Sequence, residues 1–501
     1  MRYRIALAGI LPLVILAMTA VRAAAPAEES PPARTPLRRV VDLAVGEAAD
    51  VTLADGTPAR VRLLATDAET DPVRGVVRRA TARVEVNGET VTLTSANYRL
   101  PVRAGGVRID CPITRAYYAT TNHDRWGLAK DARLRLWPAE GPLLAPDTFG
   151  CPVRERLFAS DTQMANEPVF VDAGERPGKA CYYHSGLDFG GAEGMVDVLA
   201  ATDGLVVSAA GKTLDAHARG TPVGPRYDVV YLRDDRGWYY RYSHMQSIAD
   251  GVAPGARVRR GQKIGVLGKE GGSGGWSHLH FEIQSRQPSG RWGTEAGYAY
   301  VWEAYRRAHP DALLAVARPH ILAARGKPVT LDGSRSAAFG SEITSWQWRF
   351  SDGTRAEGPA VTRVYEKVGT FSEILEVTDA RGRKAYDFAV VQVADPPNAF
   401  PPGIHAVYQP TQYIRAGDPV TFKVRTFRTQ AVGETWDFGD GSPPVTVKSD
   451  ANARVHAPDG YAVTTHTYAK AGDYIATVTH TSPTGATATG RVWVHVGIDP
   501  R

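Results

Sequence analysis

The sequence predicts a mostly β chain of several domains, and three patterns carry that prediction. Residues 278–283 alternate polar and apolar side chains, which is typical of a strand with one buried and one exposed face. Residues 83–93 contain two alternating runs on either side of Asn87-Gly88, a strong signal for a β-hairpin. From residue 319 onward, β-rich runs alternate with Asp-Gly turns, as in β-sandwiches. A chain of 501 residues has room for about three to four such domains.

The first 25 residues have the features of a secretory signal peptide. Arg2 and Arg4 give a positive start, residues 5–21 are almost wholly apolar, and small alanines follow for cleavage. Because the apolar run is slightly short for spanning a bilayer, we expect cleavage and no stable membrane insertion afterwards. The proline-rich residues 26–38 are expected to form a linker. We therefore expect a protein that is secreted or lies in the periplasm or cell envelope.

Charge and cysteine content limit the partners and the redox chemistry. The net charge of +6 is mild for this length and permits attraction to an anionic polymer such as a cell wall. The sequence has no aromatic-basic stripe or nucleic-acid motif, so we expect no nucleic-acid partner. Cys111, Cys151 and Cys181 are the cysteines, and an oxidising compartment predicts one disulfide with three pairings open. Cys181 lies three residues before His184, which leaves zinc ligation as its alternative role.

Residues 39–150 are predicted to form an N-terminal β module. The hairpin around Asn87-Gly88 lies in it, and Asp55-Gly56 marks another turn. None of its residues clusters into recognisable chemistry.

Three short segments in the middle of the chain carry the candidate chemistry: His184-Ser-Gly-Leu-Asp188, Tyr242-Ser-His244 and His278-Leu-His280-Phe-Glu282. On a strand, His278, His280 and Glu282 share one side, and the two imidazoles stand roughly 7 Å apart. That spacing suits one metal ligand and one neighbour facing the open position of the metal. The glycines around His184 and Asp188 argue against a helix and place both residues on a strand end and loop. Histidine and carboxylate together are common ligands of catalytic zinc. Each segment on its own also fits surface or turn residues without a catalytic role.

The elements around these segments are predicted from their patterns. Residues 227–233 and 238–244 form two β-rich runs around a turn, and the second run ends at His244. Tyr240 and Tyr242 in that run are predicted to be packing residues. Residues 298–314 have apolar positions at helical spacing, which predicts a short helix that stops near Pro310.

Taken together, the three segments resemble the lysostaphin-type (beta-lytic, Gly-Gly endopeptidase) zinc metallopeptidases. The resemblance covers roughly residues 175–290 and includes the glycine-rich stretch 271–277 before the last histidine pair. It implies an antiparallel β peptidase core, which we place at residues 151–315, and Zn²⁺ as the cofactor. The site residues that the resemblance implies are the zinc ligands His184, Asp188 and His280 and the catalytic histidines His244 and His278.

The resemblance also implies an activity. It predicts a secreted endopeptidase that cleaves peptide bonds in peptidoglycan by metal-activated water. One catalytic histidine would take the proton of the water and the other would help to stabilise the oxyanion, with the assignment left open. Residues 212–226 depart from the family pattern and are expected to lengthen a loop along the groove, which leaves the substrate shape open. The alternative is a non-catalytic cell-wall-binding, adhesion or regulatory protein that uses the same fold.

Residues 319–395 and 405–497 repeat one plan and resemble PKD domains, an immunoglobulin-like family. The most specific part is Trp436-Asp-Phe-Gly-Asp-Gly in the second repeat. We expect two β-sandwiches, with wall polysaccharide as a candidate partner. Asp437 and Asp440 fit either calcium ligation or turn capping, and we expect turn capping.

Overall fold

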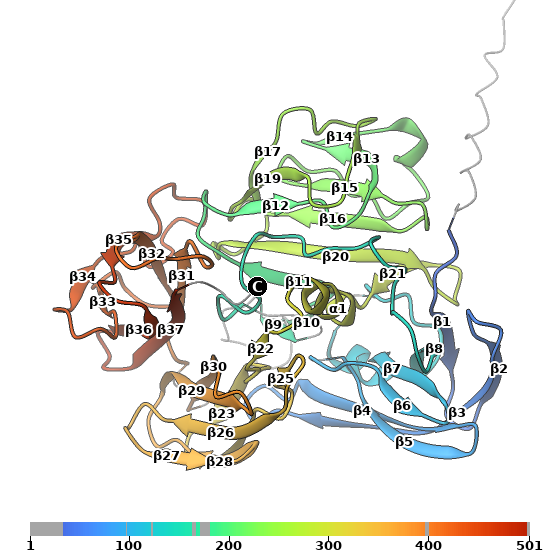
Figure 1. Cartoon of the computed structure of the whole chain (residues 1–501), viewed down its shortest axis with the longest axis horizontal. Coiled ribbons are helices and arrows are strands. Elements are labelled where there is room, and N and C mark those ends of the chain that lie inside the picture. Colours follow the sequence, from blue (N-terminus) through green and yellow to red (C-terminus); the bar gives the residue numbers. More distant parts are fainter. Residues whose placement is uncertain are drawn as a thin grey trace, which may run out of the picture. The chain divides into compact units, whose positions relative to one another are not determined.

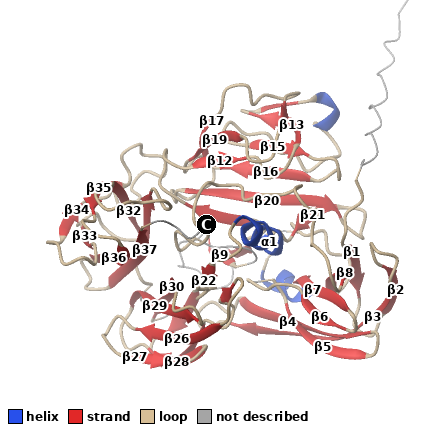
Figure 2. Cartoon of the chain, in the orientation of Figure 1, coloured by secondary structure: helices blue, strands red, loops and turns tan. Residues whose placement is uncertain are grey.

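The computed structural model describes residues 34–96, 98–121, 124–162, 167–170, 181–395 and 400–497. These residues belong to one compact unit, whereas the predicted signal peptide, residues 1–25, lies outside the described residues. Strands dominate the described part, which contains a single α-helix (Figure 2). Nearly all strand pairs are antiparallel, so the mostly β fold class is confirmed. No helix in the described ranges is both long and apolar enough to span a bilayer.

The N-terminal β module consists of two four-stranded sheets that share one core. The strands of the first sheet, in sheet order, are β2 (Ala48–Thr52), β3 (Pro58–Thr70), β4 (Val77–Val86) and β5 (Glu89–Thr94). Those of the second are β1 (Arg39–Leu43), β8 (Ala132–Pro138), β7 (Val107–Thr114) and β6 (Val102–Ala104), with the 3-10 helix η1 (Arg115–Thr120) after β7. The predicted hairpin is confirmed: Asn87 and Gly88, both with positive φ, join β4 to β5.

The middle domain, predicted as residues 151–315, is built on one large antiparallel sheet. Its path is β11 (Leu187–Gly190), β20 (His278–Arg286), β16 (Tyr239–Ser243), β15 (Val230–Arg233), β13 (Gly204–Ala209) and β14 (Lys212–Thr213). On its margins, β21 (Trp292–Glu295) pairs with β20 and β18 (Arg257–Val258) pairs with β13. A second sheet holds β12 (Asp197–Leu199), β19 (Lys263–Leu267) and β17 (Met245–Ile248). The remaining elements are β9 (Pro168–Phe170), β10 (Cys181–Tyr183), η2 (Asp215–His217) and α1 (Tyr298–Ala308), which ends before Pro310 as predicted.

Strand β20 lies between β11 and β16 (Figure 1). Polar and apolar residues alternate between its two faces as predicted, but the polar face is not exposed as expected, because His278 and Glu282 are buried as well. Leu279, Phe281 and Ile283 are buried in the core of the middle domain. The opposite face of the strand carries the polar residues, and His280 lies directly across from Asp188 on β11. Tyr240 and Tyr242 on β16 are fully buried, which confirms their packing role.

Two C-terminal domains follow. The strands of the first, predicted as residues 319–395, are β23 (Ile321–Ala324), β24 (Pro328–Asp332), β26 (Ile343–Arg349), β27 (Arg355–Glu357), β28 (Ala360–Val364), β29 (Gly369–Asp379) and β30 (Lys384–Ala394). The short strand β22 (Leu313–Leu314) precedes them and pairs with β25 (Ala337–Ala338), which lies between β24 and β26. Those of the second, predicted as residues 405–497, are β31 (Gly403–Gln409), β32 (Pro419–Phe427), β33 (Glu434–Asp437), β34 (Val445–Val447), β35 (Ala462–Thr467), β36 (Gly472–Thr481) and β37 (Thr487–Val496). A parallel pairing of β29 with β37 joins the two domains in one sheet. Asp437 and Asp440 each accept a backbone N–H two residues later, as turn caps do.

The predicted disulfide is not formed, because all three cysteines are free. Cys111 lies in the core of the N-terminal β module, Cys151 packs against the core of the middle domain, and Cys181 begins β10. The cysteines are thus separated by the packing of different elements. Burial raises the pKa of Cys111 to about 12 and that of Cys151 to about 11, so both remain protonated thiols at neutral pH.

Candidate active site

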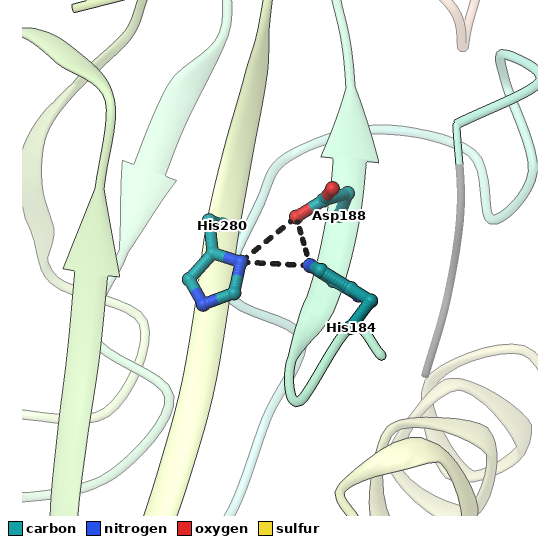
Figure 3. Close-up of side chains that lie close together, drawn as sticks. All are labelled: His184, Asp188 and His280. Atoms are coloured by element: carbon teal, nitrogen blue, oxygen red, sulfur yellow. Dashed lines mark hydrogen bonds and ion pairs between the residues drawn. The ribbon is translucent and has the colours of Figure 1, made fainter. Parts of the chain in front are cut away.

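His184, Asp188 and His280 converge on one point (Figure 3). His184 lies in the loop after β10, Asp188 in β11 and His280 in β20. Nε2 of His184 is 2.9 Å from Nδ1 of His280, and each of these nitrogens is 3.0 Å from Oδ1 of Asp188. The structure therefore brings together the three residues that were predicted as metal ligands.

The donor set fits a divalent cation better than a set of hydrogen bonds. The carboxylate oxygen can only accept, so both imidazoles would have to donate a proton to it. The two protonated nitrogens would then face each other at 2.9 Å, with no acceptor between them. Ligands of a tetrahedral zinc ion at about 2.0–2.1 Å lie about 3.3 Å apart, close to the spacing observed. Two imidazole nitrogens and one carboxylate oxygen are also the ligand types that catalytic zinc takes.

A glycine makes this approach of β20 to the His184 loop possible. A Cβ atom at Gly186 would lie 2.7 Å from Cε1 and 2.9 Å from Nε2 of His280. No side chain fits at those distances unless the imidazole moves. Gly186, midway between His184 and Asp188, therefore lets both ligands reach His280.

His244 and His278 border the same site. Nδ1 of His278 lies 3.0 Å from the carbonyl oxygen of Trp276, and Nδ1 of His244 lies 2.6 Å from that of Glu270. Because a carbonyl only accepts, Nδ1 carries the proton in each ring and Nε2 holds the lone pair. The two ring centroids are 4.7 Å apart, and Nε2 of His278 is 3.6 Å from Oδ2 of Asp188. Both predicted catalytic histidines thus present a basic nitrogen next to the candidate metal centre.

His244 has a constrained backbone. It lies between β16 and β17 with φ of 67°, a left-handed conformation that is uncommon for residues other than glycine. Its N–H donates to Oδ2 of Asp228 at 3.0 Å. The conformation is stabilised by this bond and by the bond from its ring to the carbonyl of Glu270.

The electrostatics of the site keep its acid charged and its bases neutral. Burial lowers the pKa of His278 to about 4 and also lowers that of His244. Burial alone would raise the pKa of Asp188, but electrostatic interactions with His184 and His278 and hydrogen bonds from His184 and His280 hold it well below its usual range. At neutral pH the site therefore offers an anionic ligand beside two proton acceptors.

Glu282 supports His280 from behind. Its Oε2 is 3.8 Å from Nε2 of His280, the ring nitrogen that faces away from Asp188. Thr294, Ser185 and Gln284 each donate a hydrogen bond to its Oε1. A buried carboxylate beside the second nitrogen of a ligand histidine fixes the orientation and tautomer of that histidine. The alternation of residues 278–283 predicts that Glu282 shares a face with His280, but it indicates no role for this carboxylate.

The candidate centre opens into a cavity of about 550 Å³. The N-terminal β module contributes Arg74, Arg78 and Arg125 to its lining. The first C-terminal domain contributes Ile321, and the second contributes Ile404, among other residues. No local sequence pattern indicated these contributions, because they depend on contacts between distant parts of the chain.

The predicted loop extension and Cys181 can also be placed. Residues 212–226 contain β14 and η2, and Arg226 at their end lines the cavity. Within the described residues, Cys181 is not part of the candidate metal group. The carbonyl groups that fix His244 and His278 had no sequence signal either, because every residue carries one.

Family comparisons agree with the architecture. Residues 182–290 match the family described as Peptidase family M23. Residues 311–393 match one family model described as PKD domain, and residues 403–494 match another.

Solved structures show only distant similarity. Csd3 of Helicobacter pylori is 15% identical, with 50% of this chain and 75% of that chain covered and a TM-score of 0.21. The fibronectin(III)-like modules of Clostridium thermocellum CbhA are 11% identical, with 37% of this chain and 95% of that chain covered and a TM-score of 0.15. At these TM-scores neither alignment bears on the fold.

Proposed function

The chain carries a peptidase family M23 domain of the lysostaphin type followed by two PKD domains, and from this architecture we propose that it is a zinc-dependent endopeptidase of peptidoglycan peptides. The observation that carries the proposal is the triangle of His184 Nε2, Asp188 Oδ1 and His280 Nδ1, with two basic histidines beside it. Zinc at this triangle would supply an acidified water and polarise the scissile carbonyl.

In this proposal His278 and His244 have different roles in proton transfer. His278 acts as the general base, because its Nε2 carries the lone pair and lies 3.6 Å from the ligand Asp188. The ring of His244 lies next to it and, with a proton taken up from solvent at Nε2, would donate a hydrogen bond to the developing oxyanion. The carbonyls of Trp276 and Glu270 hold both rings in the required tautomer.

The substrate and location belong to the same proposal. Peptide crosslinks of a cell wall are extracellular, which agrees with the predicted signal peptide and with PKD domains, for which we propose binding of wall polysaccharide. The lining arginines and the net charge of +6 favour an anionic polymer over a cationic one. We accordingly propose a secreted or cell-envelope protein.

Digestion of purified peptidoglycan tests the proposal. The wild type, His280→Ala and the control His495→Ala are compared by mass analysis of released products and by metal content per chain. His495 lies on β37 in the second C-terminal domain and pairs with Asp473, so its loss removes a histidine away from the candidate site. We expect cleaved peptides and one zinc for the wild type and the control, and neither for His280→Ala. Equal digestion by all three proteins would exclude the zinc site, and binding of the wall without cleavage would support the non-catalytic alternative.

A further inference from the structure

The glycine-rich loop, residues 271–277, leads directly into β20 and is held by side chains of the second C-terminal domain. The guanidinium of Arg425, which is fully buried, donates to the carbonyl oxygen of Gly275 at 2.9 Å. The side-chain amide of Asn452 donates to the carbonyl oxygen of Gly274 at 3.1 Å. Glycine loses more conformational freedom on ordering than any other residue, so a loop with four glycines needs such contacts to hold one conformation.

Gly275 fits against these partners because it has no side chain. Its φ is 88°, and a Cβ atom there would lie 2.1 Å from Oδ1 of Asn452 and 2.9 Å from Nη1 of Arg425. The loop and the second C-terminal domain are therefore complementary at the level of single atoms.

Tyr461 makes a further bond to the loop, one residue before His278. Its hydroxyl accepts the backbone N–H of Ser277 at 2.9 Å. The same hydroxyl donates to Nδ1 of His405 at 2.7 Å; because burial lowers the pKa of His405 to about 3, the ring is neutral and can accept. A buried hydroxyl that both donates and accepts fixes the position of Ser277 at the start of β20.

Trp276 connects the interdomain contact to the proton-transfer chemistry. Its ring stacks on Phe427 of β32 with a centroid distance of 3.9 Å and parallel planes. Its backbone carbonyl accepts the Nδ1–H of His278, the bond that leaves Nε2 of His278 unprotonated. A shift of this one residue would move the hydrogen-bond acceptor that sets the tautomer of His278.

We propose that the second C-terminal domain is a positioning element of the active site, which holds the glycine-rich loop so that Trp276 fixes His278 as the general base. Phe427 and Tyr461 are the positioning residues, and they act through Trp276 and Ser277. The proposal rests on the proposed function of His278. It adds a role in turnover to a domain whose expected role is binding of wall polymer.

The second C-terminal domain also contacts the middle domain outside the glycine-rich loop, so the two domains share an extended interface. Lys423 of β32 donates to the carbonyl oxygen of Glu193 at 2.7 Å, and Nδ1 of His456 donates to the carbonyl oxygen of Lys269 at 3.2 Å. Lys269 immediately precedes Glu270, whose carbonyl orients His244. The second C-terminal domain therefore contacts both chain segments that fix the catalytic histidines.

The test compares Tyr461→Phe, Phe427→Ala and Phe427→Tyr in the full chain loaded with zinc. Tyr474→Phe is the matched control, because it also removes one hydroxyl, and the hydroxyl of Tyr474 bonds to the carbonyl of Lys470 within the second C-terminal domain. The measurements are kcat and KM on a soluble peptidoglycan fragment, zinc per chain, and hydrogen exchange of the backbone amides of residues 271–278.

We expect Tyr461→Phe and Phe427→Ala to speed exchange in the glycine-rich loop and to lower kcat by about 10- to 100-fold, the usual cost of a misplaced catalytic group. KM and zinc content should stay within about twofold, because the lost contacts touch neither the ligands nor the substrate. Phe427→Tyr keeps the stacked ring and should restore kcat, and Tyr474→Phe should match the wild type.

Unchanged kcat and unchanged exchange in Tyr461→Phe would overturn the proposal, and so would a rise in kcat, which would make the domain an inhibitor. If Phe427→Ala unfolds, Tyr461→Phe decides alone, since it removes a single oxygen atom. If the wild type binds no zinc and cleaves nothing, the proposed function fails, whereas the exchange of residues 271–278 still decides whether the second C-terminal domain holds the loop.

Discussion

At the scale of single residues, the candidate centre depends on two groups that do not touch the metal position. Glu282 lies behind His280, and burial would raise its pKa, but the neighbouring His280 and the charge of Arg241 lower it to about 2. The carboxylate is therefore ionised at neutral pH. An anionic partner on the far nitrogen makes His280 a stronger and better oriented ligand.

Replacing Glu282 by Gln should weaken zinc binding by about 10- to 100-fold, the usual effect of losing such a partner. The affinity is measured by competition with a chromophoric chelator. Glu357→Gln, at a surface pair with Gln347 in the first C-terminal domain, serves as the control and should leave the affinity unchanged. Equal affinities for both variants would show that Glu282 does not support the ligand.

Gly186 is the second such residue. Alanine there would place a methyl group 2.7 Å from Cε1 of His280 and should displace the ring, with a loss of zinc affinity of about tenfold or more. Gly224→Ala is a fair control, because the nearest atom to its added Cβ, the hydroxyl of Tyr231, is 3.6 Å away. The same chelator competition gives both values, and retained affinity in Gly186→Ala would mean that the His184 loop can shift at little cost.

At the scale of elements, β21 links the middle domain to the N-terminal β module through a buried ion cluster. Glu295 accepts hydrogen bonds from Arg38 at 2.7 and 2.8 Å and from Arg135 at 2.8 Å. All three side chains are almost fully buried. Burial alone would raise the pKa of Glu295, but the two guanidinium groups hold it far below its usual value.

Glu295→Gln should destabilise the protein by about 3 kcal/mol at pH 7, because the buried Arg38 loses its counter-charge and the buried Arg135 keeps only Asp110 as an acidic partner. A carboxylate with a lowered folded-state pKa contributes its stabilisation above the unfolded pKa of about 4.3 and loses it as the pH falls further. The difference in the free energy of unfolding between the wild type and Glu295→Gln should therefore be constant from pH 7 to about 5 and shrink below a pH of about 4. Urea unfolding across this range measures it.

The control for that series is Glu140→Gln, at an exposed pair with Arg103, which should leave the urea midpoint unchanged. If the difference in the free energy of unfolding between the wild type and Glu295→Gln did not depend on pH, Glu295 would not be ionised in the folded protein.

The elements that the sequence predicted are those with a local signal. The alternation in residues 278–283, the Asn87-Gly88 hairpin and the helix before Pro310 each depend on neighbours in the chain, and all three are present. The candidate ligands were predicted from the resemblance of three short segments to the lysostaphin-type peptidases, and the structure places those three residues close together. The prediction of a disulfide was wrong, because the positions of the cysteines in the sequence do not show which packed elements separate them in the structure.

The remaining features depend on contacts between distant residues. The carbonyl of Trp276 is invisible in a sequence, since any residue would supply one, and its importance comes from the ring of His278 beside it. The left-handed backbone of His244 is set by Asp228, sixteen positions earlier. Arg425 reaches Gly275 across 150 positions, which no local pattern encodes.

At the scale of the whole molecule, the candidate site is a shared product of its domains. The middle domain supplies the ligands and both histidines, whereas the flanking domains line the cavity and hold the loop before β20. The antiparallel sheet around β20 gives the ligands a rigid base, and the glycine-rich loop needs partners from outside it. This division explains why the candidate ligands and catalytic histidines could be predicted from the sequence, whereas the residues that position them through interdomain contacts could not.

We propose that His184, Asp188 and His280 together bind one zinc ion. Anomalous diffraction at the zinc absorption edge, from crystals of the protein grown with zinc, locates such an ion. We expect one strong peak about 2.0–2.2 Å from His184 Nε2, Asp188 Oδ1 and His280 Nδ1. An empty triangle in crystals that hold zinc at other side chains would contradict it.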